Sequence, residues 1–136
     1  RRTTALGRQG VKVLLDSHAL VWWISAMDRL SSSAKRVIED GEALVSAASA
    51  YELSAKAIRG KLPGLENLTE QFEAICQEQA FGFLPIHVSH ALAAAGLTTD
   101  HRDPFDRLIA AQSLVEDLPI VTLDPAFKLF GCKTIW

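Results

Sequence analysis

The feature that most constrains the fold of this chain is an alternation of short apolar runs with helical segments of about ten residues. Apolar runs bounded by turn residues predict strands over 11–15, 43–46, 81–85, 119–123 and 132–135. Apolar residues at helical spacing, preceded by capping residues, predict helices over 17–26, 33–39, 49–59, 69–79, 87–95 and from 104 to at least 115. Strands that alternate with helices form βαβ units. We therefore expect an α/β fold with a mostly parallel sheet that helices cover on both faces.

The length and composition indicate one domain. The chain has 136 residues, of which 49% are hydrophobic, and this is enough for a single core. We assign residues 11–136 to that domain. Residues 1–10 are mostly polar and carry no strand or helix pattern, which is typical of a flexible N-terminal arm or an expression remnant. The formal net charge is −2, so any contact with nucleic acid needs a local basic patch.

The cysteines and the apolar runs indicate the compartment. Cys76 and Cys132 lie far apart and show no CxxC spacing, which argues against a zinc site or a disulfide framework. The apolar runs are far shorter than the ~20 residues that cross a bilayer. The first residues also lack the pattern of a signal peptide. We therefore expect a cytoplasmic protein with buried free thiols and no membrane contact.

Residues 101–112 (His-Arg-Asp-Pro-Phe-Asp-Arg-Leu-Ile-Ala-Ala-Gln) place two carboxylates at the start of a largely apolar helix. Asp103 is a suitable N-cap, and Pro104 suits the first helical position because its missing N–H would be unpaired there anyway. Asp106 then lies one turn into a helix that is buried on most sides. A charge at the edge of a core is costly without a partner or a cation. The alternative for both acids is helix capping alone.

Three more acids are expected to meet Asp106. Asp16 and Asp124 each follow an apolar strand directly, and ligands of open α/β sheets bind at the carboxyl ends of the strands. Glu52 lies one turn into the helix after the second strand, close to the same edge. Each has a structural alternative: Asp16 as a helix cap, Glu52 as an exposed helix residue, and Asp124 as the start of a turn.

Four converging carboxylates need neutralisation. Two carboxylates about 4 Å apart repel by roughly 4 kcal/mol at an effective dielectric constant near 20. Oxygen-only ligands without histidine or cysteine suit Mg²⁺ or Mn²⁺, which also bind substrate phosphates. This pattern favours metal-assisted hydrolysis of a phosphodiester.

Four segments, in this order and spacing, resemble the PIN-domain ribonucleases and, within them, the VapC-type toxins of VapBC toxin–antitoxin modules. They are Leu-Leu-Asp-Ser-His-Ala-Leu at 14–20, Val-Ser-Ala-Ala-Ser-Ala-Tyr-Glu-Leu at 45–53, His-Arg-Asp-Pro-Phe-Asp-Arg at 101–107 and Ile-Val-Thr-Leu-Asp at 120–124. The Lys61-Leu62 loop after the second segment fits the same pattern. The resemblance covers 11–136 and implies a PIN-like α/β/α fold with a central, mostly parallel five-stranded sheet.

The resemblance also implies an activity and partners. These are an Mg²⁺- or Mn²⁺-dependent endoribonuclease that cleaves cellular RNA, a homodimer, and a cognate VapB antitoxin whose C-terminal segment occupies the active-site groove. The positions that match the family's acidic quartet are Asp16, Glu52, Asp106 and Asp124. We expect the three aspartates to hold metal and Glu52 to bind metal or orient the attacking water. Asp103 is expected as a cap or outer-shell acid, and Ser17 and Thr122 as hydroxyls that hold the acids or a metal-bound water.

Several basic residues lie near these acids and are candidates for contacts to RNA phosphates. They are Lys56, Arg59, Lys61, Arg102 and Arg107. The alternatives are a solvated helix end for the first three and an ion pair with a neighbouring acid for Arg107.

Aromatic residues and one histidine complete the candidates. Trp22 and Trp23 are adjacent, so one is expected in the core and the other at the surface or a partner, with base stacking as an alternative. His101 is close enough to the acids in sequence to contact substrate. A competing class for the whole protein is a catalytically silent PIN-like binding module that captures a basic peptide in its acidic groove.

Overall fold

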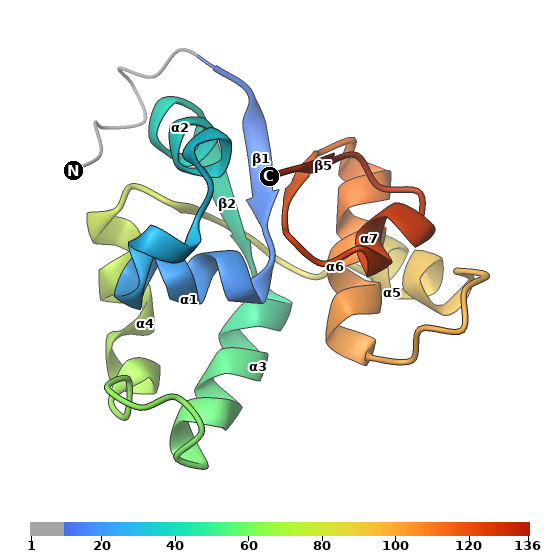
Figure 1. Ribbon diagram of the computed structural model, residues 1–136. Coiled ribbons are helices and arrows are strands. Elements are labelled where there is room, and N and C mark those ends of the chain that lie inside the picture. Colours follow the sequence, from blue (N-terminus) through green and yellow to red (C-terminus); the bar gives the residue numbers. More distant parts are fainter. Residues whose placement is uncertain (1–9) are drawn as a thin grey trace.

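The computed structural model describes residues 10–136 (Figure 1). The sequence predicts a flexible arm or remnant over residues 1–10. Apart from Gly10, these residues lie outside the part of the chain that the structure describes. In the described part, no helix is long and apolar enough to span a membrane.

A five-stranded sheet forms the centre, and all its neighbouring strands pair in parallel. The strands are β1 (Lys12–Leu15), β2 (Glu42–Ser46), β3 (Gly82–Leu84), β4 (Ile120–Val121) and β5 (Thr134–Ile135). Their order in the sheet is β3-β2-β1-β4-β5. The mostly parallel five-stranded sheet expected from the sequence is thus confirmed, with the first strand at its middle.

Helices connect these strands on both faces of the sheet (Figure 1). They are α1 (Ser17–Ser25), α2 (Ser32–Asp40), α3 (Ala47–Ile58), α4 (Leu68–Glu78), α5 (Val88–Ala95), α6 (Pro104–Glu116) and α7 (Ala126–Leu129), together with the 3₁₀ turn η2 (Met27–Arg29). The sequence pattern did not predict η2 or α7. Both are too short to show a helical period, because one turn alone takes 3.6 residues.

The side chains of β1 alternate between two cores, which explains the continuous apolar run in the sequence. Val13 and Leu15 join a cluster with residues of α1, α2, α3 and α4, among them Leu20 and Ile38. Leu14 joins the opposite cluster, which contains residues of α6 and α7. This arrangement makes the fold a three-layer α/β/α structure, as the sequence predicted.

The strand register determines which residues meet at the carboxyl ends of the strands. Leu15 at the end of β1 pairs with Val45 of β2 and Val121 of β4. The residues that follow these three therefore emerge at one edge, where α1 and α3 begin. Asp16 and Thr122 come directly after paired positions, and this local geometry brings together segments more than a hundred residues apart in sequence.

Candidate active site

Asp16 ends β1 and caps α1, so its carboxylate is fixed by the local fold. One oxygen, Oδ1, accepts a hydrogen bond of 2.7 Å from the backbone N–H of Ala19. The other, Oδ2, accepts a short hydrogen bond from the hydroxyl of Thr122. The residue is 3% exposed, and burial raises the pKa of Asp16 to about 6 although both hydrogen bonds act in the opposite direction. Asp16 thus caps α1, and among residues 10–136 no lysine or arginine pairs with its carboxylate.

Thr122 links Asp16 to Asp124. Its Oγ1 donates to Asp16 and accepts a 3.0 Å hydrogen bond from the backbone N–H of Asp124. The Oδ1 atom of Asp124 accepts a 2.9 Å hydrogen bond from the N–H of Ala126, which forms the turn that leads into α7. One hydroxyl thus joins the carboxylate of Asp16 to the backbone of Asp124.

The start of α6 supplies the facing acids. The Oδ1 atom of Asp103 accepts hydrogen bonds from the N–H groups of Phe105 and Asp106, at 2.9 and 3.4 Å, and this confirms Asp103 as the N-cap. The Oδ2 atom of Asp106 lies 2.8 Å from Nε2 of His101. Burial, together with the nearby charges of Asp103 and Asp124, raises the pKa of Asp106, although the His101 contact lowers it.

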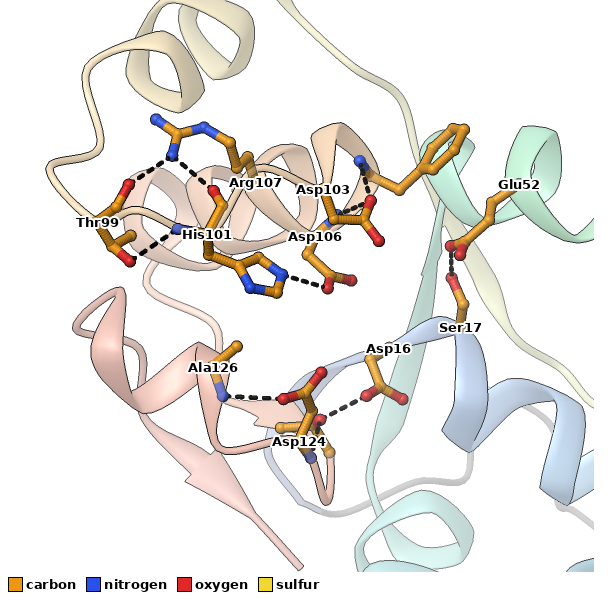
Figure 2. Close-up of polar contacts among 12 residues, drawn as sticks. Asp16, Ser17, Glu52, Thr99, His101, Asp103, Asp106, Arg107, Asp124 and Ala126 are labelled. Carbon is orange, nitrogen blue, oxygen red and sulfur yellow. Dashed lines mark hydrogen bonds and ion pairs between the residues drawn. The ribbon is translucent and has the colours of Figure 1, made fainter.

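Figure 2 shows these carboxylates on two sides of one space. Asp103 and Asp106 lie above it at the start of α6, where the Asp106 carboxylate points down, and Asp16 and Asp124 lie below it after β1 and β4, where the Asp124 carboxylate points up. The electrostatic influence of Asp106 on Asp16 and of Asp124 on Asp106 shows that the two sides interact. His101 and the two acids of α6 also offer one ligand atom each within 4.8 Å of one another.

Glu52 on α3 is surrounded differently. Its Oε1 accepts a 2.7 Å hydrogen bond from the hydroxyl of Ser17, and its Oε2 lies 3.0 Å from the ammonium nitrogen of Lys56. Because the Ser17 proton goes to Glu52, the neighbouring hydroxyl of Ser49, 3.0 Å away, must donate to Ser17. Glu52 is 7% exposed, so the structure rules out the alternative of an exposed helix residue.

Ser49 is a contributor that the sequence analysis missed. It is 1% exposed and holds Ser17, which in turn holds Glu52. Ser49 lies three residues before Glu52 on α3, and residues at this spacing share one helix face. The three-residue spacing of Ser49 and Glu52 within 45–53 therefore indicates that the two side chains lie on the same face of α3.

The basic residues divide into two groups. Arg59, Lys61 and Arg102 are exposed and free to meet a solvent-borne ligand. Lys56 pairs with Glu52. The guanidinium of Arg107 donates to four backbone carbonyls, those of Ala94, Leu97, Thr99 and His101, at 2.8–3.2 Å. This network favours a structural role for Arg107, which ties α5 and the following loop to α6, over the expected phosphate contact or ion pair.

The donor set fits a divalent cation. Among residues 10–136, no lysine or arginine forms an ion pair with the four aspartates of the cluster, Asp16, Asp103, Asp106 and Asp124. Burial raises the pKa of Asp16 and of Asp106, and a bound cation would offset that cost of ionisation. Carboxylate oxygens with one imidazole nitrogen are suitable ligands for a divalent metal.

Comparison with known proteins identifies the family. The family model of the PIN domain matches residues 13–131. Ribonuclease VapC22 of Mycobacterium tuberculosis is 36% identical over 118 residues, and the match covers 82% of this chain and 86% of the relative. VapBC2 from Rickettsia felis, solved with a DNA fragment from its promoter, has a TM-score of 0.67 at 15% identity, over 91% of this chain and 96% of that chain.

A second solved structure agrees. A toxin–antitoxin complex from Klebsiella pneumoniae has a TM-score of 0.59 at 18% identity, with 83% of this chain and 87% of that chain covered. At such identities the two structural matches show a shared fold. The family model and the mycobacterial relative go further, because they cover most of the chain in sequence. This protein belongs to the PIN domain family.

Proposed function

We propose that this protein is a divalent-metal-dependent endoribonuclease and the toxin of a VapBC-type toxin–antitoxin module. The observation that carries the proposal is the buried carboxylate of Asp16 beside the half-buried carboxylate of Asp106: both have raised pKa values, and among residues 10–136 no lysine or arginine pairs with either. A nuclease site of this kind needs a cation that also binds phosphate. The ribonuclease relative and the matched toxin–antitoxin complex support the same reading.

In this proposal the three aspartates hold Mg²⁺ or Mn²⁺, with Asp103 and His101 beside them. When bound, the metal neutralises the cluster and stabilises negative charge on the phosphate that is cleaved. Thr122 keeps Asp16 and Asp124 at a fixed separation through its two hydrogen bonds.

Glu52 receives a different role in this scheme. Lys56 already balances its charge, and Ser17 orients its carboxylate. A carboxylate oxygen has more than one lone pair, so Glu52 can still accept a hydrogen bond from a water molecule. Orientation of the attacking water therefore suits Glu52 better than metal binding does.

The test is cleavage of a mixed pool of structured cellular RNAs by wild type and Asp16→Asn, each with Mg²⁺, Mn²⁺ or EDTA. We expect discrete products from the wild type that require metal and are absent with Asp16→Asn. Asp40→Asn is the matched control, because Asp40 is an exposed acid at the end of α2 that takes no part in the cluster. Equal cleavage by Asp16→Asn and wild type would contradict the proposal.

The same experiment separates the nuclease from a silent binding module. In the module, the acidic groove would capture a basic peptide without metal, and a chelator would leave that binding unchanged. The silent module is excluded if the wild type binds metal and cleaves RNA and Asp16→Asn does neither.

The proposed partner is a VapB-type antitoxin, supported by the matched complex of a toxin with its antitoxin. We place the protein in the cytoplasm with its RNA substrate, where the two buried free cysteines would stay reduced. Inhibition of cleavage by the co-expressed antitoxin, at one antitoxin site per toxin, would test the pairing.

A homodimer is also proposed. Val88 and Leu92 are 75% and 69% exposed and lie four residues apart on α5, so they share one face. Adjacent exposed apolar side chains are typical of interaction surfaces. Light scattering should give twice the chain mass for wild type and the single mass for Leu92→Asp. A monomeric wild type at micromolar concentration would contradict this.

A further inference from the structure

A small cavity lies directly beside the acids. Its volume is about 250 Å³, and Asp16, Asp124, His18 and Trp22 line it together with Leu123 and Pro125. One wall therefore consists of two carboxylates proposed to hold metal, and the rest is aromatic or apolar. This combination lies outside the roles assigned so far, because the metal site uses only the carboxylate wall.

Trp22 is placed as a platform at the surface. Trp23 is buried and its indole N–H donates to Gln79 at 3.0 Å, as expected for the tryptophan that enters the core. Trp22 is half-buried and remains accessible from the cavity. Trp136 packs edge-on against its ring, with the ring centroids 5.7 Å apart, and this fixes the plane of the indole.

Two further groups surround the Trp22 ring. The imidazole of His18 lies 5.8 Å from it, centroid to centroid, and the guanidinium carbon of Arg29 lies 5.5 Å above it. His18 and Arg29 are both exposed. The imidazole, the guanidinium and the Trp136 ring thus hold the indole in place beside the cavity.

We propose that this cavity binds one nucleobase of single-stranded RNA, stacked on the wall formed by Trp22 and His18, next to the phosphate that is cleaved. Proteins that recognise single-stranded RNA splay bases out of the stack and place them on aromatic side chains. A cavity of about 250 Å³ is smaller than the sites of ~300–1,000 Å³ that hold drug-sized ligands, so one planar ring system is a suitable occupant.

The two carboxylates of the cavity favour a base over an apolar peptide side chain as its occupant. A base is joined through its ribose to a phosphate, and Asp16 and Asp124 are the residues through which a metal would receive that phosphate. An apolar side chain would use the aromatic wall but would bring no group for the two acids. This inference rests on the proposed ribonuclease function, since it needs RNA at the metal site.

The test measures binding of labelled single-stranded RNA twelve-mers of mixed sequence by fluorescence anisotropy, with Ca²⁺ present to suppress cleavage. Trp22→Ala should weaken the affinity by about 5- to 150-fold, the range found when one stacked base is lost. Trp22→Phe keeps a ring and should recover most of the affinity. Phe83→Ala is the matched control, since Phe83 is an exposed aromatic residue on edge strand β3, outside this cavity.

An abasic substrate tests the contact from the ligand side. Twelve-mers that lack bases around the cleaved position should bind wild type and Trp22→Ala equally weakly. Mn²⁺ binding, followed by electron paramagnetic resonance without RNA, should be the same in wild type and Trp22→Ala, and thermal unfolding should show that Trp22→Ala is still folded at the assay temperature, although the loss of packing against Trp136 lowers its unfolding temperature. These two readings separate loss of stacking from loss of the metal site or the fold.

The outcomes separate this inference from the function on which it rests. A wild type that cleaves RNA, with Trp22→Ala binding it as tightly, would overturn the base site and leave the nuclease standing. Unchanged RNA affinity with weaker binding of the antitoxin would assign the cavity to the protein partner and also overturn the base site. A wild type that neither binds nor cleaves RNA would overturn the proposed function itself.

Discussion

Asp16 and Glu52 are about equally buried, at 3% and 7% exposure, yet different groups surround their carboxylates. Asp16 accepts hydrogen bonds from neutral donors, a backbone N–H and the Thr122 hydroxyl. Glu52 accepts one from Ser17 and one from the ammonium group of Lys56. Within residues 10–136, Lys56 thus balances the charge of Glu52, whereas no lysine or arginine pairs with Asp16. This difference is the basis on which we propose Asp16 as a metal ligand and Glu52 as an acid that supports the reaction.

The largest expected effect comes from removal of the Asp16 charge. Asp16→Asn keeps an oxygen for the Ala19 cap but cannot neutralise a cation, so cleavage should fall by about a thousandfold or more, as for the loss of several kcal/mol of charge stabilisation. The metal-free variant should at the same time be more stable than wild type at pH 7, by about 1–3 kcal/mol. Single-turnover cleavage and urea unfolding measure the two effects. A variant that is both inactive and less stable would indicate a structural role for Asp16.

The pH dependence of stability sharpens this result. Burial raises the pKa of Asp16 from 3.8 to about 6, so the folded protein binds this proton more tightly than the unfolded chain does. The contribution of Asp16 to stability is therefore full below pH 4 and is lost as the pH rises to 6, a change of about 3 kcal/mol. The difference between wild type and Asp16→Asn in urea unfolding, from pH 4 to 7, isolates this residue. Saturating Mn²⁺ should abolish the difference in slope, and persistence of the slope would argue against metal at Asp16.

Metal-induced stabilisation compares the two kinds of acid directly. A ligand at a hundred times its dissociation constant stabilises a protein by about 2.7 kcal/mol. We expect Mn²⁺ to raise the free energy of unfolding by about this amount in wild type and in Glu52→Gln, and by little or nothing in Asp106→Asn. Thermal unfolding with and without Mn²⁺ measures it. Equal loss of the rise in both variants would place Glu52 among the metal ligands and remove the distinction drawn above.

Much of this architecture was predictable because its signals are local. Asp16 and Asp124 were placed at the sheet edge from the apolar strands that precede them, and Asp103 was recognised as a cap from the proline that follows. The long helix α6 was found from its apolar period. These features depend on neighbours within one or two turns, and such neighbours are visible in the sequence.

The remaining features depend on pairing between distant segments. Thr122 was expected to hold an acid only through the family resemblance; its hydrogen bond to Asp16 exists because β4 lies beside β1, and no local pattern encodes that strand order. The four carbonyls that receive the Arg107 guanidinium converge only after α5 and its following loop pack against α6. Sequence proximity to Asp106 suggested a phosphate contact for this arginine, whereas tertiary packing determines what its side chain meets.

The smallest expected effect comes from breaking the internal balance of Glu52. Lys56→Met removes the ammonium group and leaves Glu52 with the Ser17 hydroxyl alone, so Glu52 would resemble Asp16. The Lys56 side chain is 38% exposed, so solvent replaces part of the lost interaction, and the free energy of unfolding should fall by only about 0.5–1 kcal/mol. A double-mutant cycle with Glu52→Gln measures the coupling. If the comparison holds, Lys56→Met should also bind Mn²⁺ more tightly than wild type, because an uncompensated Glu52 adds negative charge near the site. An unchanged Mn²⁺ affinity with measurable coupling would show that the pair is purely structural.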